Sequence, residues 1–190
     1  MIGVLAVIAI LASLLIPKIY EAINNARISN SALSYNTVKT ALADHYAKYG
    51  SLTSSNGVTI ATPIPAFDGI LLAEGFLDKP FQVKIGTAGA TNTFVEVRQA
   101  VAATTAPDGS NVPAYDLDAN AAPVNDATGS AVVQCVISGV TLGDAFALST
   151  LLDGPSLSAV DSSVGSDDFK GRVRYAATAV TTVYIYVTHR

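Results

Sequence analysis

Residues 1–17 read MIGVLAVIAILASLLIP and contain no charged side chain. As an α-helix this run would rise ~26 Å at ~1.5 Å per residue, slightly less than a ~30 Å hydrocarbon layer. A polar sequence without Gly or Pro continues from Lys18 to Tyr49. We therefore expect one helix of nearly fifty residues, which Pro17 kinks or locally melts because proline lacks an N–H and crowds the preceding turn.

An apolar run of this kind also occurs in signal peptides and in membrane anchors. A secretory signal peptide needs a small-residue cleavage site after its apolar region. The sequence Pro17-Lys18-Ile19-Tyr20 is a poor site, which disfavours a signal peptide. A simple transmembrane anchor stays open.

The polar part of the helix carries two apolar stripes. One stripe recurs at spacings of three, four or seven and is predicted to pack on the chain's own sheet. Its members are Ile28, Tyr35, Val38, Leu42, His45 and Tyr49. The other lies on roughly the opposite side and consists of Ile19, Ile23, Ala26 and Leu33. Because the apolar side changes along the helix, we expect two different partners, the head of the same chain and neighbouring copies.

Residues 3–17, GVLAVIAILASLLIP, resemble the apolar N-terminal segment of type IV pilins and type II secretion pseudopilins, including its closing proline. The resemblance covers roughly the first fifty residues. It implies that a prepilin peptidase cuts before an aromatic residue, which is then N-methylated, and that a glutamate follows. These residues would precede Met1, so the resemblance implies about five further residues and a span of ~22, enough for a bilayer.

The resemblance also implies a role for the apolar run. In lipid the helix satisfies its own backbone, and in a filament the same side chains pack against other copies. The residues expected to pack in the filament core are Ile2, Gly3, Val4, Leu5, Val7, Ile8, Ile10, Leu11, Leu14, Leu15 and Ile16, followed by the kink at Pro17. The small residues Gly3, Ala6, Ala9, Ala12 and Ser13 would let helices approach closely.

The rest of the chain is expected to form a β-rich head. A loop is predicted over 50–65, a short helix within 65–80, a half-buried strand over 94–101 and a buried strand over 131–140. A helix over 141–152 should bury Leu142, Ala145, Phe146, Leu148 and Leu152. Residues 172–178 and 181–188 should pair antiparallel, and 104–129 and 156–168 should be polar surface loops. The predicted fold class is therefore α+β, pilin-like, a long helix packed on a small antiparallel sheet. It divides into a transmembrane or filament-core helix (1–25), an amphipathic helix on the head (26–50) and the globular head (51–190).

Composition and motifs argue against several other functions. The net charge is −4, so no overall positive field attracts nucleic acid. Cys135 lies in an apolar run and is expected to be a core residue. No P-loop, G-x-S-x-G or paired Cys-x-x-Cys motif occurs, so we expect no enzyme, no catalytic residue, no cofactor and no metal.

One acidic segment partly matches a metal-binding pattern. Asp116-Leu117-Asp118-Ala119-Asn120 resembles the opening of a calcium loop, but Ala121 and Ala127 replace the required Gly and Glu. A solvated acidic loop is therefore expected here, and likewise around Asp161, Asp167 and Asp168. A calcium site completed by distant loop residues stays open.

Three functions remain. The first is a subunit of a type IV pilus-like filament for adhesion, motility or DNA uptake, held in the inner membrane before an assembly machine exports it to the cell surface. The second is a pseudopilin of type II secretion. The third is a single-span anchored protein with a ligand-binding periplasmic head.

Overall fold

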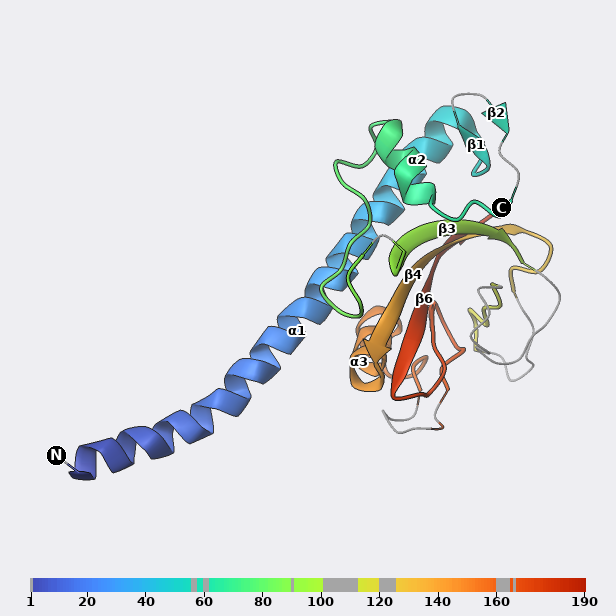
Figure 1. Cartoon of the computed structure of the whole chain (residues 1–190). Helices are drawn as coiled ribbons and strands as arrows, with labels where there is room; N and C mark the ends of the chain where they lie inside the picture. Colours follow the sequence, from blue (N-terminus) through green and yellow to red (C-terminus); the bar gives the residue numbers. More distant parts are fainter. Residues whose placement is uncertain are drawn as a thin grey trace.

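The computed structural model describes residues 2–55, 58–59, 62–89, 91–100, 113–119, 126–159, 165 and 167–190. Its fold is α+β: a long N-terminal helix and a four-stranded antiparallel sheet. Figure 1 shows the helix α1 (Ile2–Tyr49) extending well beyond the head, with only its C-terminal half against it. The predicted long helix and the α+β class are thus confirmed.

Pro17 lies inside α1, and the helix continues through it without a break. The expected local melting is therefore wrong. Proline removes one intrahelical hydrogen bond, but the residues on both sides of Pro17 remain helical. Figure 1 shows α1 curving gently towards its N-terminal end, without a sharp bend.

The sheet has the strand order β3-β4-β6-β5, and every neighbouring pair is antiparallel. Its strands are β3 (Thr93–Gln99), β4 (Ala131–Thr141), β5 (Val173–Arg174) and β6 (Val180–His189). β-branched residues fill β4 and β6, as expected for strands with packed faces. The predicted pairing of the last two strands is confirmed, although β5 is only two residues long.

A short hairpin and two short helices complete the described fold, and both helices contact α1. The segment expected to be a loop contains a hairpin of two short strands, β1 (Ser54–Ser55) and β2 (Val58–Thr59). The helix α2 (Phe67–Ala73) follows this hairpin. The helix α3 (Leu142–Asp153) starts directly after β4, with the Thr141 hydroxyl accepting from the Asp144 N–H. Of its expected core residues, Leu142, Ala145 and Leu148 are buried, whereas Phe146 and Leu152 are only partly so.

The sheet is packed on both faces. Val95, Val97, Cys135 and Ile185 belong to the main core with α1, α2 and α3. The opposite face carries a second hydrophobic cluster. Its residues come from β4, from β6 and from the chain between β3 and β4. Its buried members are Ala100, Tyr115, Ala127, Val132, Val136 and Tyr184. Strand β3 is therefore buried along most of its length and not half-buried as expected.

β4 has a bulge at Ser138 and Gly139, where the register with β6 shifts. Gly139 has φ +73°, and a Cβ there would collide with Thr87. The backbone groups of Ser138 bond to the preceding loop instead, with Thr87 N–H donating to its carbonyl at 2.8 Å and its own N–H donating to the Asn92 carbonyl at 2.7 Å. These two bonds join Thr87 and Asn92 to the sheet at the bulge.

Candidate assembly surface and polar sites of the head

The N-terminal part of α1 exposes an unusual number of large apolar side chains. Between 52% and 67% of the surface is exposed for each of Ile8, Ile10, Leu11, Leu14, Leu15 and Ile16. Gly3 is also exposed and has open space where a Cβ would stand. The side chains of Ile2, Val4, Leu5 and Val7 lie outside the described part of the chain. We call the apolar helix of residues 2–17 the rod.

The polar residue of the rod does not interrupt this apolar surface. The Ser13 hydroxyl donates to the Ile10 carbonyl at 2.8 Å, so it is satisfied within the helix. Soluble monomers rarely expose contiguous apolar patches beyond a few hundred Å². Full burial of each large side chain is worth about 1.5–3 kcal/mol. Burial of the rod against another apolar surface is therefore strongly favourable.

The part of α1 that follows the rod has one buried side and one exposed apolar side, as its sequence predicts. Ile28, Tyr35, Val38, Leu42 and His45 are buried against the head, and Tyr49 is partly buried. Ile19, Ile23, Ala26 and Leu33 are exposed on the other side. The apolar surface of the rod thus continues along the helix to the level of the head.

Side chains of α1 form polar contacts with the head at three points along the helix. Asn24 donates to Asp144 of α3 at 2.7 Å, Tyr35 donates to the Tyr186 carbonyl at 2.9 Å, and His45 contacts Glu74 at 2.6 Å. Burial raises the pKa of Tyr35 to about 12, so its hydroxyl stays protonated and able to donate.

His45 and Glu74 form a fully buried pair, since neither side chain has exposed surface. The imidazole lies among the rings of Tyr49, Phe67 and Phe76. Its Nε2 has no hydrogen-bond partner within the described residues. The pair joins the end of α1 to the end of α2, in agreement with the expected packing role of His45.

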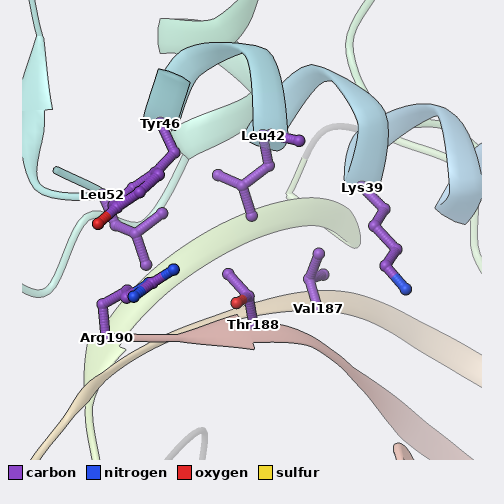
Figure 2. Close-up of a pocket in the computed structure, with 8 residues that line it drawn as sticks. Lys39, Leu42, Tyr46, Leu52, Val187, Thr188 and Arg190 are labelled. Atoms are coloured by element: carbon purple, nitrogen blue, oxygen red, sulfur yellow. The ribbon is translucent and has the colours of Figure 1, made fainter. Parts of the chain in front are cut away.

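A small groove lies between the end of α1 and the end of β6 (Figure 2). It measures about 250 Å³, and its lining comes from both elements and from Leu52. Lys39 reaches into one end, and at the other the Arg190 guanidinium lies 4.6 Å from the ring centroid of Tyr46. Between these cations, Leu42 projects into the groove from α1 and Val187 from β6.

The outer face of the sheet holds a buried polar network that the sequence did not indicate. Glu96 accepts from Gln134 at 2.7 Å and from Arg98 at 2.8 Å, and Gln134 accepts from the Tyr115 hydroxyl at 2.7 Å. Arg174 is 1% exposed and lies over the Tyr115 ring, 5.3 Å from its centroid. Residues 113–116 and Ala127 are therefore buried, and the expectation of a polar surface loop is wrong for them. Asp118, Asp126 and residues 128–129 are exposed, as expected of a surface loop, and residues 104–112 and 120–125 lie outside the described part.

Three carboxylates meet in the segments that lie over the outer face of the sheet. The ligand oxygens of Asp116, Asp118 and Asp126 lie within 4.8 Å of one another. Asp116 is 7% exposed, while the other two are less enclosed. Burial raises the pKa of Asp116, and the neighbouring carboxyl groups raise it further. Asp116 is thus buried, against the expectation of a solvated acidic loop, whereas Asp118 and Asp126 are exposed.

Asp168 is also buried, against the expectation of a charged surface loop; Asp161 lies outside the described residues. Asp168 is 1% exposed and accepts from the Ser149 hydroxyl at 2.6 Å and from the Lys170 N–H at 3.3 Å. Burial raises its pKa from 3.8 to about 6, and the bond from Ser149 only partly offsets this effect.

The raised pKa of Asp168 predicts a change of stability with pH. The folded chain holds this proton more tightly than the unfolded chain, so the contribution is full below pH 4 and is lost as pH rises through 6. The loss amounts to about 3 kcal/mol at ~1.4 kcal/mol per pKa unit. We expect Asp168→Asn to remove this slope in urea unfolding between pH 4 and 7, with the exposed Asp78→Asn as control. A variant that keeps the wild-type slope would show that other groups cause it.

The single cysteine is in the main core, as expected. Cys135 has no exposed surface, and burial raises the pKa of its thiol. A protonated, enclosed thiol is a poor nucleophile.

No helix in the described part of the chain meets the length and apolarity that crossing a membrane requires. Comparisons with protein-family models, curated proteins and solved structures found no match.

Proposed function

We propose that the chain is a structural subunit that polymerises through its N-terminal rod into an extracellular filament of the type IV pilus kind. The observation that carries the proposal is the row of large apolar side chains exposed along the rod, each with more than half of its surface uncovered. The long helix, which runs from the rod onto an antiparallel sheet without a break, supports the proposal.

Copies of the same rod are a suitable cover for this surface. The rod presents apolar side chains together with Gly3 and the internally satisfied Ser13, which allow close helix–helix contact. The exposed stripe of Ile19, Ile23 and Leu33 extends the contact towards the head. A rod that packs into a bundle with its head on the outside forms heterologous contacts, which do not close and so give a helical fibre.

The three parts of the chain then have separate tasks. Residues 1–25 serve in the inner membrane before assembly and in the filament core afterwards. Residues 26–50 join this core to the head, and residues 51–190 form the surface of the fibre. The partners are other copies of the chain and an assembly machine, and the final location is the cell surface.

Photo-cross-linking from the rod tests the proposal. A benzophenone amino acid at Leu14, which is 67% exposed, is expected to give covalent dimers of the chain upon irradiation in cells. The same group at Leu151, an exposed leucine of α3, should give far fewer. Cross-linking of Leu14 to lipid alone would contradict the proposal and favour a single-span anchor. Equal dimer yields from both positions would contradict the role of the rod.

A further inference from the structure

The groove between the ends of α1 and β6 combines an apolar interior with two cations (Figure 2). Its apolar lining includes Leu42, Leu52 and Val187, which are 3%, 3% and 5% exposed. Lys39 reaches into one end, and the Arg190 guanidinium lies at the other. No described residue of the lining is acidic. The groove therefore suits a ligand that is both apolar and anionic.

The two cations are available to such a ligand. Neither Lys39 nor Arg190 forms an ion pair with a described residue. The Arg190 guanidinium stacks on the Tyr46 ring, 4.6 Å from its centroid, and a stacked guanidinium keeps its N–H donors in the plane for a carboxylate. The whole chain carries a net charge of −4, so this positive site stands against an acidic background and selects for anions.

The spacing of the cations indicates the shape of the ligand. Lys39 and Tyr46 are separated by two turns of α1, about 10 Å along the helix axis, and Leu42 and Ala43 lie between them on the same side. An extended peptide rises ~3.3 Å per residue, and alternate side chains point to the same side. Residues four apart in such a peptide are thus ~13 Å apart on one side, a span that the long side chains of Lys39 and Arg190 can match.

We propose that the groove binds an extended acidic segment of another protein, with the pattern acidic–x–apolar–x–acidic. The two carboxylates pair with Lys39 at one end and with Arg190 at the other, and the apolar side chain between them covers Leu42 and Val187. The groove belongs to the head and the end of α1 and not to the rod. The proposal therefore goes beyond filament formation and does not depend on it.

The size of the groove favours one side chain of a longer chain over a small free ligand. Pockets for small molecules measure about 300–1,000 Å³, whereas this groove measures about 250 Å³. A second copy of the chain does not supply the segment. Within residues 1–190 the pattern occurs at Glu74-Gly75-Phe76-Leu77-Asp78, and there Glu74 is buried against His45. The segment therefore comes from a different protein.

An NMR titration of the full chain in a non-ionic detergent tests the binding. The peptide acetyl-Glu-Ser-Leu-Ser-Glu-amide is expected to shift the methyl signals of Leu42, Leu52 and Val187 in a saturable manner. Glutamine in place of both glutamates should weaken binding about fourfold or more, because both ion pairs are lost. Serine in place of the leucine should weaken it about tenfold or more, because the buried apolar side chain is lost.

Variants of the chain make the test specific to the groove. Lys39→Gln and Arg190→Gln should each weaken binding about two- to fivefold, whereas Lys79→Gln, at an exposed lysine outside the groove, should bind as the wild type. Ala43→Trp, at an exposed position of the lining, should fill the groove and weaken binding about tenfold or more. Ala73→Trp, at the exposed end of α2, is its matched control and should bind normally.

The absence of a saturable shift at millimolar peptide would overturn the proposal, and so would an unchanged affinity in Ala43→Trp. Equal weakening by Lys39→Gln and Lys79→Gln would show attraction by general charge and would also overturn it. Decanedioate that binds as tightly as the peptide would contradict the assignment to a peptide segment. None of these outcomes bears on filament formation, because the titration uses single subunits whose rod is covered by detergent.

Discussion

A Leu11→Lys substitution is expected to abolish filament formation while leaving the head folded. Leu11 is 61% exposed on the rod, which extends beyond the head, so a lysine there should leave the fold of the head unchanged. Within a bundle of rods, the same ammonium group would be buried without a partner. An unpaired buried charge costs about 3–5 kcal/mol, which lowers the subunit association constant by about two to four powers of ten.

Leu151→Lys is the matched control for this prediction. Leu151 is 52% exposed and lies on α3, so the change has the same chemistry and a similar starting exposure but falls outside the rod. Electron microscopy of sheared surface fractions should show filaments for Leu151→Lys and none for Leu11→Lys, with both chains present in the membrane fraction. Filaments of normal length from Leu11→Lys would contradict the assembly role of the rod.

The second large effect is expected from Asp68, a 6% exposed aspartate in the first turn of α2. Its two carboxylate oxygens accept from the backbone N–H groups of Phe81, at 3.1 Å, and Val95, at 3.2 Å. The side chain thereby holds α2, the segment after it and strand β3 together. Asp68→Ala leaves two buried N–H groups without an acceptor, at about 1–3 kcal/mol each.

We therefore expect Asp68→Ala to lower the free energy of unfolding by about 2–6 kcal/mol in urea titrations. Asp68→Asn should lose less, because the amide keeps one acceptor oxygen for one of the two N–H groups. Asp78→Ala, at an exposed position shortly after the end of α2, should change stability by no more than about 0.5 kcal/mol. A loss below about 1 kcal/mol for Asp68→Ala would show that the two N–H groups find different acceptors.

The helices and strands were largely predictable because each has a local signal. Helix spacing distinguished the buried side of α1 from the exposed one, and β-branched runs identified β4 and β6. Such signals depend on neighbours in sequence, which is why they survive without knowledge of the tertiary contacts.

The polar contacts of the head were not predictable, because they join residues far apart in sequence. Asp68 and Val95 are 27 residues apart, and Glu96 and Gln134 are 38 apart. Nothing in the local pattern distinguishes Asp168, which is buried, from the exposed Asp167. The sequence pattern does contain Asp116 and Asp118, but a calcium loop of fixed spacing expects its last ligand at position 127, whereas the structure brings in Asp126.

The continuity of α1 has a mechanical consequence. No break separates the rod from the part of the helix that lies on the head, so traction along the rod passes into the head without a flexible neck. It reaches the head first at Asn24, which is bonded to Asp144 of α3, and then at Tyr35 and His45, which are 1% and 0% exposed and are tied to β6 and to the residue after α2. A pull on the rod therefore acts as shear on α3 and on the interior of the sheet.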